Sequence, residues 1–282
     1  MHAAVSGKGY RLNRPLELLV KEQIYQALDT RTQQLISSLE IHDQIPSTNS
    51  YLMELCKDDD ATGIVCLAEH QTAGKGRRGR TWVSPYGSNI YLSILWRYSQ
   101  QGPSALAGLS LAVGVAVIRA LTQHAVQGVG LKWPNDIFYQ GKKLGGILVE
   151  VSGESDGPCM VVVGLGLNLF LSESEAENIT QSWTDLTKIT GEKRQPRNRW
   201  VGTLLNHLLS VLDDFQNSGL AAYLNEWRSY DCLKNQSATL LLGDRHVYGV
   251  VEGIDDDGLL LMKLQDGTMQ RFASGEVSFN TA

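Results

Sequence analysis

Three apolar segments that follow one another through short turn-rich pieces constrain the fold of this chain most. They read LKWPNDIFY, GILVEV and CMVVVGLGLNL, and the pieces between them are QGKKLG and SGESDGP. Short apolar runs separated by glycine-rich turns are typical of strands that pair with their sequence neighbours. The middle of the chain therefore predicts an antiparallel meander.

Helical and strand-like patterns alternate ahead of this meander. The helices expected there begin at Pro15, at Ser47–Asn49 and at about Ser104, and the expected strands are SLEIHDQI, GIVCLAE and NIYLSILW. In the third helix, which is expected to end at Gln123, Gly108, Ala112 and Ala116 recur every four positions. That spacing predicts a thin helix face for close packing on a sheet.

After the meander the pattern becomes helical and then changes again. Residues Arg199 to Phe215 have strong helical spacing, and a shorter helix is expected to carry Leu220 to Trp227. Beyond about Asp231, short apolar runs are split by LGDR, DDDG and QDG, which predicts a small β-barrel of roughly 50 residues. The fold class is therefore α+β, with a mixed core followed by an all-β module.

The composition fits a folded protein of one large or two modest domains. The chain has 282 residues, 43% of them hydrophobic, and a formal net charge of −5. A dedicated nucleic-acid binder would usually carry a basic surplus. The four cysteines have no C-x-x-C spacing, no apolar signal segment is present, and the apolar run of residues 106–118 is too short to span a bilayer. A cytoplasmic location without membrane contact is expected.

The stretch AGKGRRGRTW, residues 73–82, places four positive charges and three glycines in ten residues. It matches G-x-G-x-x-G and, nearly, the phosphate-binding loop pattern, but both require a helix to follow. The chain continues instead with VSPYGSNIYLSILW, which is strand-like. We interpret the stretch as an anion-binding loop of another kind. A solvated charged loop is the alternative.

The sequence KWPND, residues 132–136, interrupts an apolar strand with a proline and sets Asp136 at the break. Asp136 could hold Mg²⁺ or orient a cationic group, and Lys143 could face a phosphate. A turn with a surface ion pair explains the same residues equally well. Ser47–Asn49 could bind a polar ligand head, although ordinary helix capping accounts for them too.

Two further features are less specific. Glycines alternate in GLGLN, where Asn168 could touch a nucleotide, and Trp183 could stack on a base or belong to a satellite core. The chain lacks an H-E-x-x-H pattern, and none of its six histidines falls in a recognisable acid–base pair. An enzyme built this way would position its reactants and neutralise developing charge.

Six of these segments occur together in an order and spacing that resemble the biotin–protein ligases, most closely the bacterial bifunctional ligase/repressors. The segments are STNSYL, AEHQTAGKGRRGRTW, SNIYLSILW, LKWPNDIF, KKLGGILVE and GLGLN. The resemblance implies a class II synthetase-like mixed-sheet core followed by an SH3-like barrel. It divides the chain into residues 1–14, a remnant of a winged-helix wing or linker, residues 15–232, the catalytic domain, and residues 233–282, the SH3-like domain.

The resemblance also implies a two-step reaction. Biotin and ATP would form biotinyl-5′-AMP and pyrophosphate with Mg²⁺ present, and a lysine of the biotin carboxyl carrier protein of acetyl-CoA carboxylase would then accept the biotin. No dedicated protein metal site is implied, although Mg²⁺ could lie near Asp136. A homodimer through the exposed edge of the core sheet is plausible.

Site roles follow from the resemblance position by position. Biotin binding is assigned to Ser47, Thr48, Asn49, Gln71, Lys75, Gly76, Arg77 and Lys143. Adenylate or ATP binding is assigned to Gly74, Arg78, Arg80, Asn135, Asn168 and Trp183. Catalytic roles are assigned to Arg77, Lys143, Asp136 and Lys132. We expect Arg77 to clamp phosphate, the loop to be mobile when empty, and Trp82 to pack beneath it.

The chain departs from the family pattern in three places. It begins inside what would be the wing of a helix-turn-helix domain, so DNA binding is not expected. Lys75 stands where the related proteins have Arg, and Asn280 stands where a basic residue that helps with ATP is expected, which predicts weaker nucleotide binding. A lipoate or octanoate ligase and a non-catalytic regulator that senses biotinyl-AMP are the alternative functions.

Overall fold

The computed structural model describes residues 2–5, 9–12, 16–58, 60–99, 102–153, 157–192 and 195–279. Within the segment assigned to a wing remnant, β1 (His2–Val5) pairs antiparallel with β2 (Gly9–Leu12). The rest of that segment and Asn280 lie outside the described residues, so the expectations placed on them stay expectations.

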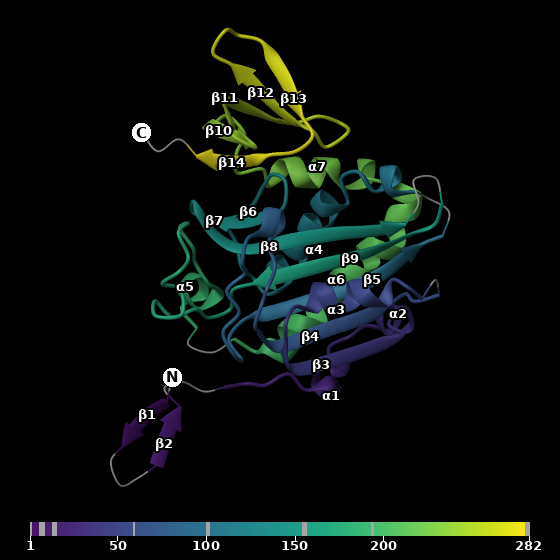
Figure 1. Cartoon of the computed structure of the whole chain (residues 1–282), viewed down its shortest axis with the longest axis vertical. Helices are drawn as coiled ribbons and strands as arrows, with labels where there is room; N and C mark the ends of the chain where they lie inside the picture. The colour runs from purple at the N-terminus through teal and green to yellow at the C-terminus, as the bar shows by residue number, and fades with distance from the viewer. Residues whose placement is uncertain are drawn as a thin grey trace.

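The core is a seven-stranded mixed sheet (Figure 1). In chain order its strands are β3 (Ser38–Ile45), β4 (Ile64–Gln71), β5 (Ile90–Tyr98), β6 (Val129–Lys132), β7 (Asp136–Tyr139), β8 (Lys142–Gly153) and β9 (Cys159–Leu167). In space the order is β3-β4-β5-β9-β8-β7-β6, with β3 and β4 parallel and all other neighbours antiparallel. The predicted meander is confirmed as β6 to β9.

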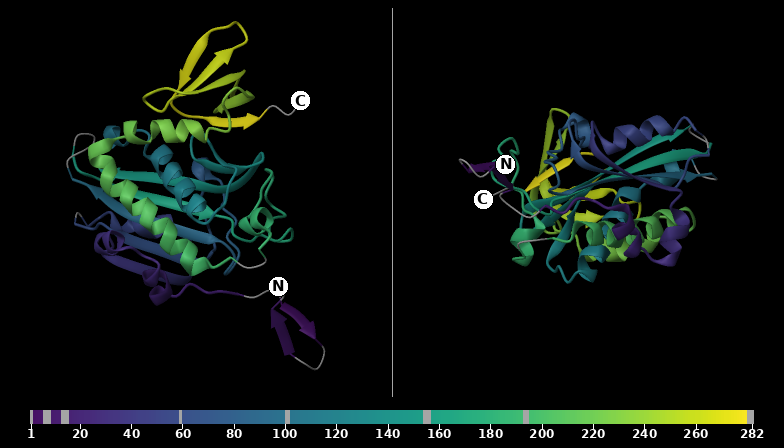
Figure 2. Two further views of the ribbon diagram at one scale, coloured as in Figure 1. Left: turned by 180° about the vertical axis from the view of Figure 1, so that it is seen from behind. Right: turned by 90° about the horizontal axis from the view of Figure 1, so that it is seen from below.

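Helices cover both faces of this sheet. The face turned toward the viewer in Figure 1 carries α3 (Thr48–Leu55), whose Leu52 packs on Cys66 and Leu95. The opposite face carries further helices, among them the longest, α6, seen from behind in Figure 2. These are α1 (Lys21–Gln26), α2 (Thr30–Leu35), α4 (Leu109–Gln123), α6 (Arg197–Ser218) and α7 (Ala221–Ser229). The main hydrophobic core lies between that face and these helices.

One helical segment, Pro103–Gln123, has the length and apolar composition of a membrane span. It joins a 3-10 turn, η2 (Pro103–Leu106), to α4, so the length argument applied to residues 106–118 does not hold for it. Its most apolar stretch is 67% buried within the molecule, as expected of a core helix.

Two helix predictions are corrected by the structure. Residues 16–20 are not helical, and α1 begins only at Lys21. The helix expected from Ser104 breaks at Gly108, which has a φ of 81° and precedes α4 instead of forming part of its thin face. A Cβ on Gly108 would lie 2.5 Å from Leu220 Cδ2, so the break lets this turn pack closely on the chain before α7.

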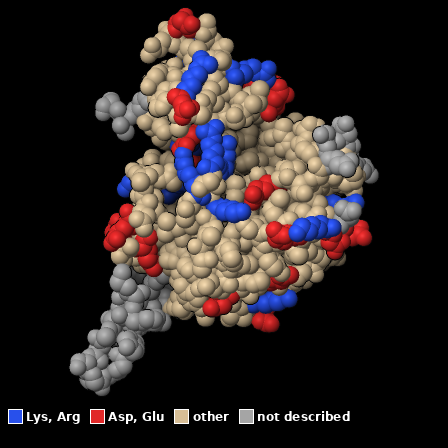
Figure 3. Space-filling view, viewed as in Figure 1, with Lys and Arg blue, Asp and Glu red and all other residues tan. Residues whose placement is uncertain are grey.

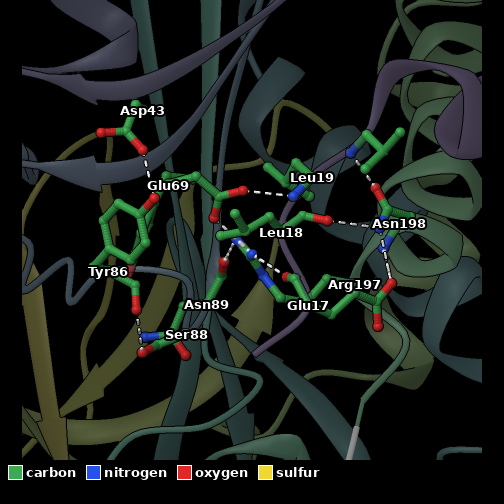
Figure 4. Close-up of polar contacts among 12 residues, drawn as sticks. Glu17, Leu18, Leu19, Asp43, Glu69, Tyr86, Ser88, Asn89, Arg197 and Asn198 are labelled. Carbon is green, nitrogen blue, oxygen red and sulfur yellow. Dashed lines mark hydrogen bonds and ion pairs between the residues drawn. The ribbon is translucent and has the colours of Figure 1, made fainter. Parts of the chain in front are cut away.

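A buried polar network explains why residues 16–20 are extended (Figure 4). Arg197 Nη1 lies 2.6 Å from Glu69 Oε2 and also donates to the carbonyl of Glu17 at 2.6 Å. Asn198 donates to the Glu17 carboxylate at 2.8 Å and accepts from Val20 N at 2.7 Å. These backbone groups hydrogen-bond to side chains of β4 and α6, so they are not available for the hydrogen bonds of a helix.

The C-terminal module is a five-stranded antiparallel sheet of SH3-like type, drawn in yellow-green in Figure 1. Its strands are β10 (Ser237–Leu242), β11 (Arg245–Ile254), β12 (Leu260–Leu264), β13 (Met269–Phe272) and β14 (Glu276–Phe279), in the order β13-β12-β11-β10-β14. The module is bonded to the core, because Trp133 Nε1 donates to the Gly258 carbonyl at 3.0 Å.

Candidate functional site

A cavity lies where the basic loop, residues 73–82, faces the central strands of the core and the C-terminal module. Its lining comes from the start of α3, the end of β4, the turn between β6 and β7, β8, β9 and the start of β14. Because both modules contribute, the cavity depends on their relative placement.

One end of the cavity is polar but uncharged. Ser47 caps α3, and its hydroxyl accepts from Ser50 N at 3.4 Å. Gln71, at the end of β4, accepts from Thr48 N at 2.9 Å and lies 3.2 Å from Thr48 Oγ1. The Gln71 amide also donates to Ser84 Oγ at 3.0 Å. These bonds hold hydroxyl and amide groups in place around a space that a polar, neutral ligand head could fill.

Asn49 joins this polar end to β8 and β5. Its Nδ2 donates to Glu150 Oε2 at 2.8 Å, and its Oδ1 lies 2.6 Å from Ser93 Oγ. A Cβ on Gly164 would lie only 2.0 Å from Asn49 Oδ1. The first glycine of GLGLN therefore makes room for Asn49.

The basic loop folds back on itself. Lys75 and Thr81 form an antiparallel bridge, and Gly76 N donates to the Arg80 carbonyl at 2.7 Å. Between them lies a single 3-10 turn, η1 (Arg77–Gly79), in which Arg78 has a φ of 56°. Because of this turn, the side chain of Arg77 points in a different direction from those of Arg78 and Arg80. Figure 3 shows basic side chains gathered where the C-terminal module meets the core.

Arg77 points into the cavity, whereas its neighbours contact the C-terminal module. Its Nη1 donates to Asn135 Oδ1 at 3.0 Å, and burial together with Arg78 lowers the pKa of its guanidinium. Arg78 donates to the Leu241 carbonyl at 3.4 Å, and Arg80 forms an ion pair with Glu276.

The charged end of the cavity is formed by Arg77, Lys132 and Lys143, which we call the cation cluster. Lys143 Nζ lies 2.7 Å from Asp136 Oδ1, and both side chains are largely buried. Burial lowers the pKa of Lys132, with Asp136 acting in the opposite direction. Three cations around one carboxylate leave an excess of positive charge, so this end suits an anion such as phosphate.

Lys143 is held by backbone pairing with a distant loop. Its N donates to the Ser182 carbonyl at 2.9 Å, and its carbonyl accepts from Thr184 N at 2.9 Å. The side chain passes over Trp82, with Nζ 5.6 Å from the ring centroid.

Trp82 lies in a notch made by two glycines. A Cβ on Gly166 would be 2.3 Å from Trp82 Cε2, and one on Gly146 would be 3.3 Å from its Cζ3. The indole Nε1 is buried and has no hydrogen-bond partner among the described residues. Trp82 thus packs between the basic loop and the sheet, where the sequence placed it.

Most of the site residues named from the sequence converge here. The cavity is lined by Ser47, Thr48, Asn49, Gln71, Lys75, Gly76, Arg77, Arg80, Lys132, Asn135, Asp136 and Lys143. Their individual roles stay predictions.

Four of the predicted residues lie outside this lining. Gly74 and Arg78 lie on the outer side of the loop. Asn168 is buried and donates to the Thr184 carbonyl at 3.1 Å, so it fixes the loop that pairs with Lys143. Trp183 lies under Lys188, whose Nζ is 3.6 Å from the ring centroid. The nucleotide contacts assigned to these four residues also stay predictions.

Several lining residues were not predicted from the sequence. Ser93 is fully buried and lies 2.7 Å from Thr48 Oγ1, and its hydroxyl in the apolar run NIYLSILW was a usable signal. Tyr91, Gln181 and Glu276 gave no such signal. Glu276 reaches the cavity only because the C-terminal module folds against the basic loop.

A metal would find few protein ligands here. Among the described residues no group of three or more His, Cys, Asp or Glu side chains could hold a metal ion. Of the residues that line the cavity, Asp136 and Glu276 carry carboxylates.

Comparisons with known proteins agree with this geometry. Residues 41–168 match the family described as biotin/lipoate A/B protein ligase, and residues 235–280 match the biotin protein ligase C-terminal domain. The chain is 38% identical over 278 residues to the bifunctional ligase/repressor BirA of Escherichia coli (strain K12), an alignment that covers 99% of this chain and 83% of that protein.

It is also 34% identical over 238 residues to the biotin–[acetyl-CoA-carboxylase] ligase of Mycobacterium tuberculosis, covering 82% of this chain and 85% of the relative. Among solved structures, the biotin protein ligase from Aquifex aeolicus in complex with biotin and ATP superposes with a TM-score of 0.71 and 26% identity. That superposition covers 88% of this chain and all of the other.

Proposed function

The chain belongs to the biotin/lipoate A/B protein ligase family as a biotin protein ligase, and we propose that it converts biotin and ATP into biotinyl-5′-AMP and pyrophosphate and then transfers the biotinyl group to a lysine of the biotin carboxyl carrier protein of acetyl-CoA carboxylase. The observation that carries this proposal is one cavity with a neutral polar end and a cationic end. Such a cavity suits a ligand that has an uncharged polar head at one end and, at the other, a carboxylate that must meet a phosphate.

The polar end would hold the head of biotin. Ser47, Thr48 and Gln71 offer hydroxyl and amide groups fixed by their mutual hydrogen bonds. Fixed donors and acceptors orient a ligand with little loss of side-chain entropy. The biotin carboxylate would then extend toward Lys143.

In the first step, a carboxylate oxygen of biotin bonds to the α-phosphorus of ATP. The bond from the α-phosphorus to the bridging oxygen breaks, and pyrophosphate leaves with the electron pair. Arg77 and Lys143 would neutralise the charge that develops on the phosphate oxygens, which is the largest single contribution in many such sites. No covalent bond to the protein is needed.

In the second step, the neutral amine of the acceptor lysine attacks the acyl carbon. The amide bond forms, AMP leaves with the electron pair of the acyl–oxygen bond, and the nitrogen loses a proton. The cation cluster would stabilise the departing phosphate in this step as well.

Mg²⁺ would enter with ATP. The ion usually keeps several water ligands and needs one or two carboxylates in addition to phosphate oxygens. Asp136 meets that requirement, so the residues present fit the ion. Bound Mg²⁺ would supply further positive charge next to the phosphates.

ATP–pyrophosphate exchange tests the first step, with biotin, lipoate or octanoate as the only acid. We expect exchange with biotin alone and a loss of about 100- to 1000-fold in Arg77→Ala and Lys143→Ala, as when a charge-stabilising donor is removed. Arg31→Ala and Lys57→Ala are matched controls, because both residues are exposed, form ion pairs with surface carboxylates and do not line the cavity.

The other outcomes separate the alternatives. Exchange with lipoate or octanoate in place of biotin would assign the chain to the lipoate branch of the family. A folded sample that exchanges with no acid would favour a non-catalytic regulator, which salt-sensitive duplex binding in a gel shift would then reveal.

Two further features of the protein are proposed. A cytoplasmic location fits the free cysteines, since none of the four is bonded to another. A homodimer could form along β3, which is an edge strand of the core sheet and can pair with a second copy.

A further inference from the structure

Lys132 lines the cavity, and two phenyl rings meet around its ammonium group from outside the cavity lining. Its Nζ is 4.7 Å from the ring centroid of Phe138 and 5.7 Å from that of Phe279. Within the described part of the chain this ammonium has no hydrogen-bond or salt-bridge partner, since Asp136 is paired with Lys143 at 2.7 Å. The two aromatic rings are therefore the groups that contact this ammonium directly.

The rings come from different modules. Phe138 is on β7, two residues beyond the KWPND turn, and Phe279 is the last residue of β14. The pairing of Phe279 with Ala238 on β10 fixes the strand, and the two ring centroids are 6.0 Å apart at an interplanar angle of 56°. The C-terminal module therefore supplies half of the aromatic surface around Lys132.

This arrangement has a clear electrostatic effect. An ammonium taken out of water without hydrogen bonds is costly to keep charged, and its pKa is lowered here by burial. The negative face of an aromatic ring offsets part of that cost without using any of the three N–H donors. Those donors are left for a ligand in the cavity.

We propose that Phe279 is a positioning residue for adenylation, which holds the Lys132 ammonium against Phe138 so that it faces the phosphate of the bound nucleotide. The C-terminal module thereby acts on the chemistry through one ring as well as through the cavity wall. The proposal rests on the proposed function, because the adenylation reaction supplies the phosphate.

Two substitutions of Phe279 distinguish an electrostatic role of its ring face from simple apolar packing around Lys132. Phe279→Leu keeps an apolar side chain but removes the ring face, and Phe279→Tyr keeps the face. We expect Phe279→Leu to lower kcat of biotin-dependent pyrophosphate exchange by about 3- to 30-fold, the range of a partly desolvated cation–π contact. KM for biotin should stay within about twofold, and Phe279→Tyr should restore kcat.

Phe272→Leu is the matched control. Phe272 is a buried phenyl ring on β13 of the same module and is not one of the two rings near the Lys132 ammonium. If Phe272→Leu lowers kcat as much as Phe279→Leu, the effect is general loosening of the module and the proposal fails. It also fails if Phe279→Leu has the wild-type kcat, or if Phe279→Tyr is as slow as Phe279→Leu.

A measurement of ATP binding tests variants whose pyrophosphate exchange is too slow to measure. ATP affinity by calorimetry should fall on Phe279→Leu in the wild-type background and show no further fall in a Lys132→Met background, because coupled residues are not additive. Equal effects in both backgrounds would mean that Phe279 does not act through Lys132. Wild-type exchange with biotin is measured first, so failure of the proposed function is recognised separately from failure of this inference.

Discussion

At the scale of single residues, the site depends on charges held in a poorly solvated place. Lys132 is 9% exposed and Lys143 is paired with Asp136, whereas Arg80 is half exposed and pairs with Glu276. Buried charges interact more strongly with a ligand than exposed ones, because water screens them less. The inner cations should therefore dominate binding of the phosphate.

The lowered pKa of Lys132 predicts how activity depends on pH. Burial favours the neutral amine, so Lys132 loses its proton at a lower pH than an ordinary lysine. The neutral amine no longer neutralises phosphate, so kcat/KM for ATP, which reports groups of the free protein, should fall with rising pH before the ordinary lysine range of about 10.4 is reached. Arginine stays protonated in that range.

Profiles of kcat/KM for ATP against pH, measured for the wild type and Lys132→Arg, check this. The alkaline fall should move to higher pH in Lys132→Arg, while Lys57→Arg, on the surface, should leave it in place. A fall at the same pH in all three proteins would assign the titration to another group.

The sequence predicted the kinds of residues in the site better than their contacts. Basic side chains in a glycine-rich loop and an aspartate at a strand break indicate anion chemistry from residue type alone. Their individual roles came from the family resemblance and await the exchange assay. The ion pair of Arg80 with Glu276 could not be foreseen, because 196 positions separate the two residues (276 − 80) and only the docking of the C-terminal module joins them.

At the scale of elements, the glycines of β9 shape the cavity because they have no side chains. Gly164 and Gly166 leave space that Asn49 and Trp82 occupy. Strand interiors usually disfavour glycine, so its presence in β9 marks a close approach by another group. The alternation GLGLN signalled that approach, but the sequence did not say which side chains would fill the space.

Gly166→Ala should weaken nucleotide binding. The new Cβ would lie 2.3 Å from Trp82 Cε2, so the indole and the basic loop attached to it must shift. Overpacking of this kind typically costs about 1–3 kcal/mol, which corresponds to a loss of about 5- to 150-fold if it falls on the ligand-bound loop.

Calorimetric titration with ATP measures that loss. If Trp82 is the cause, Gly166→Ala should have little further effect in a Trp82→Leu background. An equal loss in both backgrounds would locate the conflict elsewhere.

Element boundaries were predicted well where apolar periodicity was strong and poorly where side chains bind the backbone. The strands β3 to β5, the meander and α6 follow their sequence patterns closely. The helix expected from Pro15 begins only at Lys21, because Glu69 and Asn198 hydrogen-bond the backbone of residues 19 and 20 in an extended form. Such contacts link distant parts of the chain and leave no local signal.

At the scale of the whole molecule, the pair of Glu69 and Arg197 joins β4 to α6. Their side chains are 5% and 4% exposed. Removing one member of a buried pair leaves the other charge uncompensated, so Arg197→Met should lower the free energy of unfolding by about 3–5 kcal/mol. Denaturant unfolding measures it.

Arg31→Met is the matched comparison. Arg31 also pairs with helix carboxylates, Asp213 and Asp214, but its side chain is 50% exposed. Its loss should cost no more than about 1 kcal/mol. Comparable losses for the two variants would show that burial does not set the strength of the Glu69 pair.

The place of β14 in the chain has a consequence for biosynthesis. Glu276 and Val277 line the cavity, and β14 pairs with β10 from nearly 40 positions earlier. During translation, the core sheet and its helices leave the ribosome long before β14 does. A nascent chain at that stage has its basic loop, Lys132 and Lys143 but not the wall that closes over them. The cavity is therefore completed only once β14 has been made and has paired with β10, after every other element that lines it.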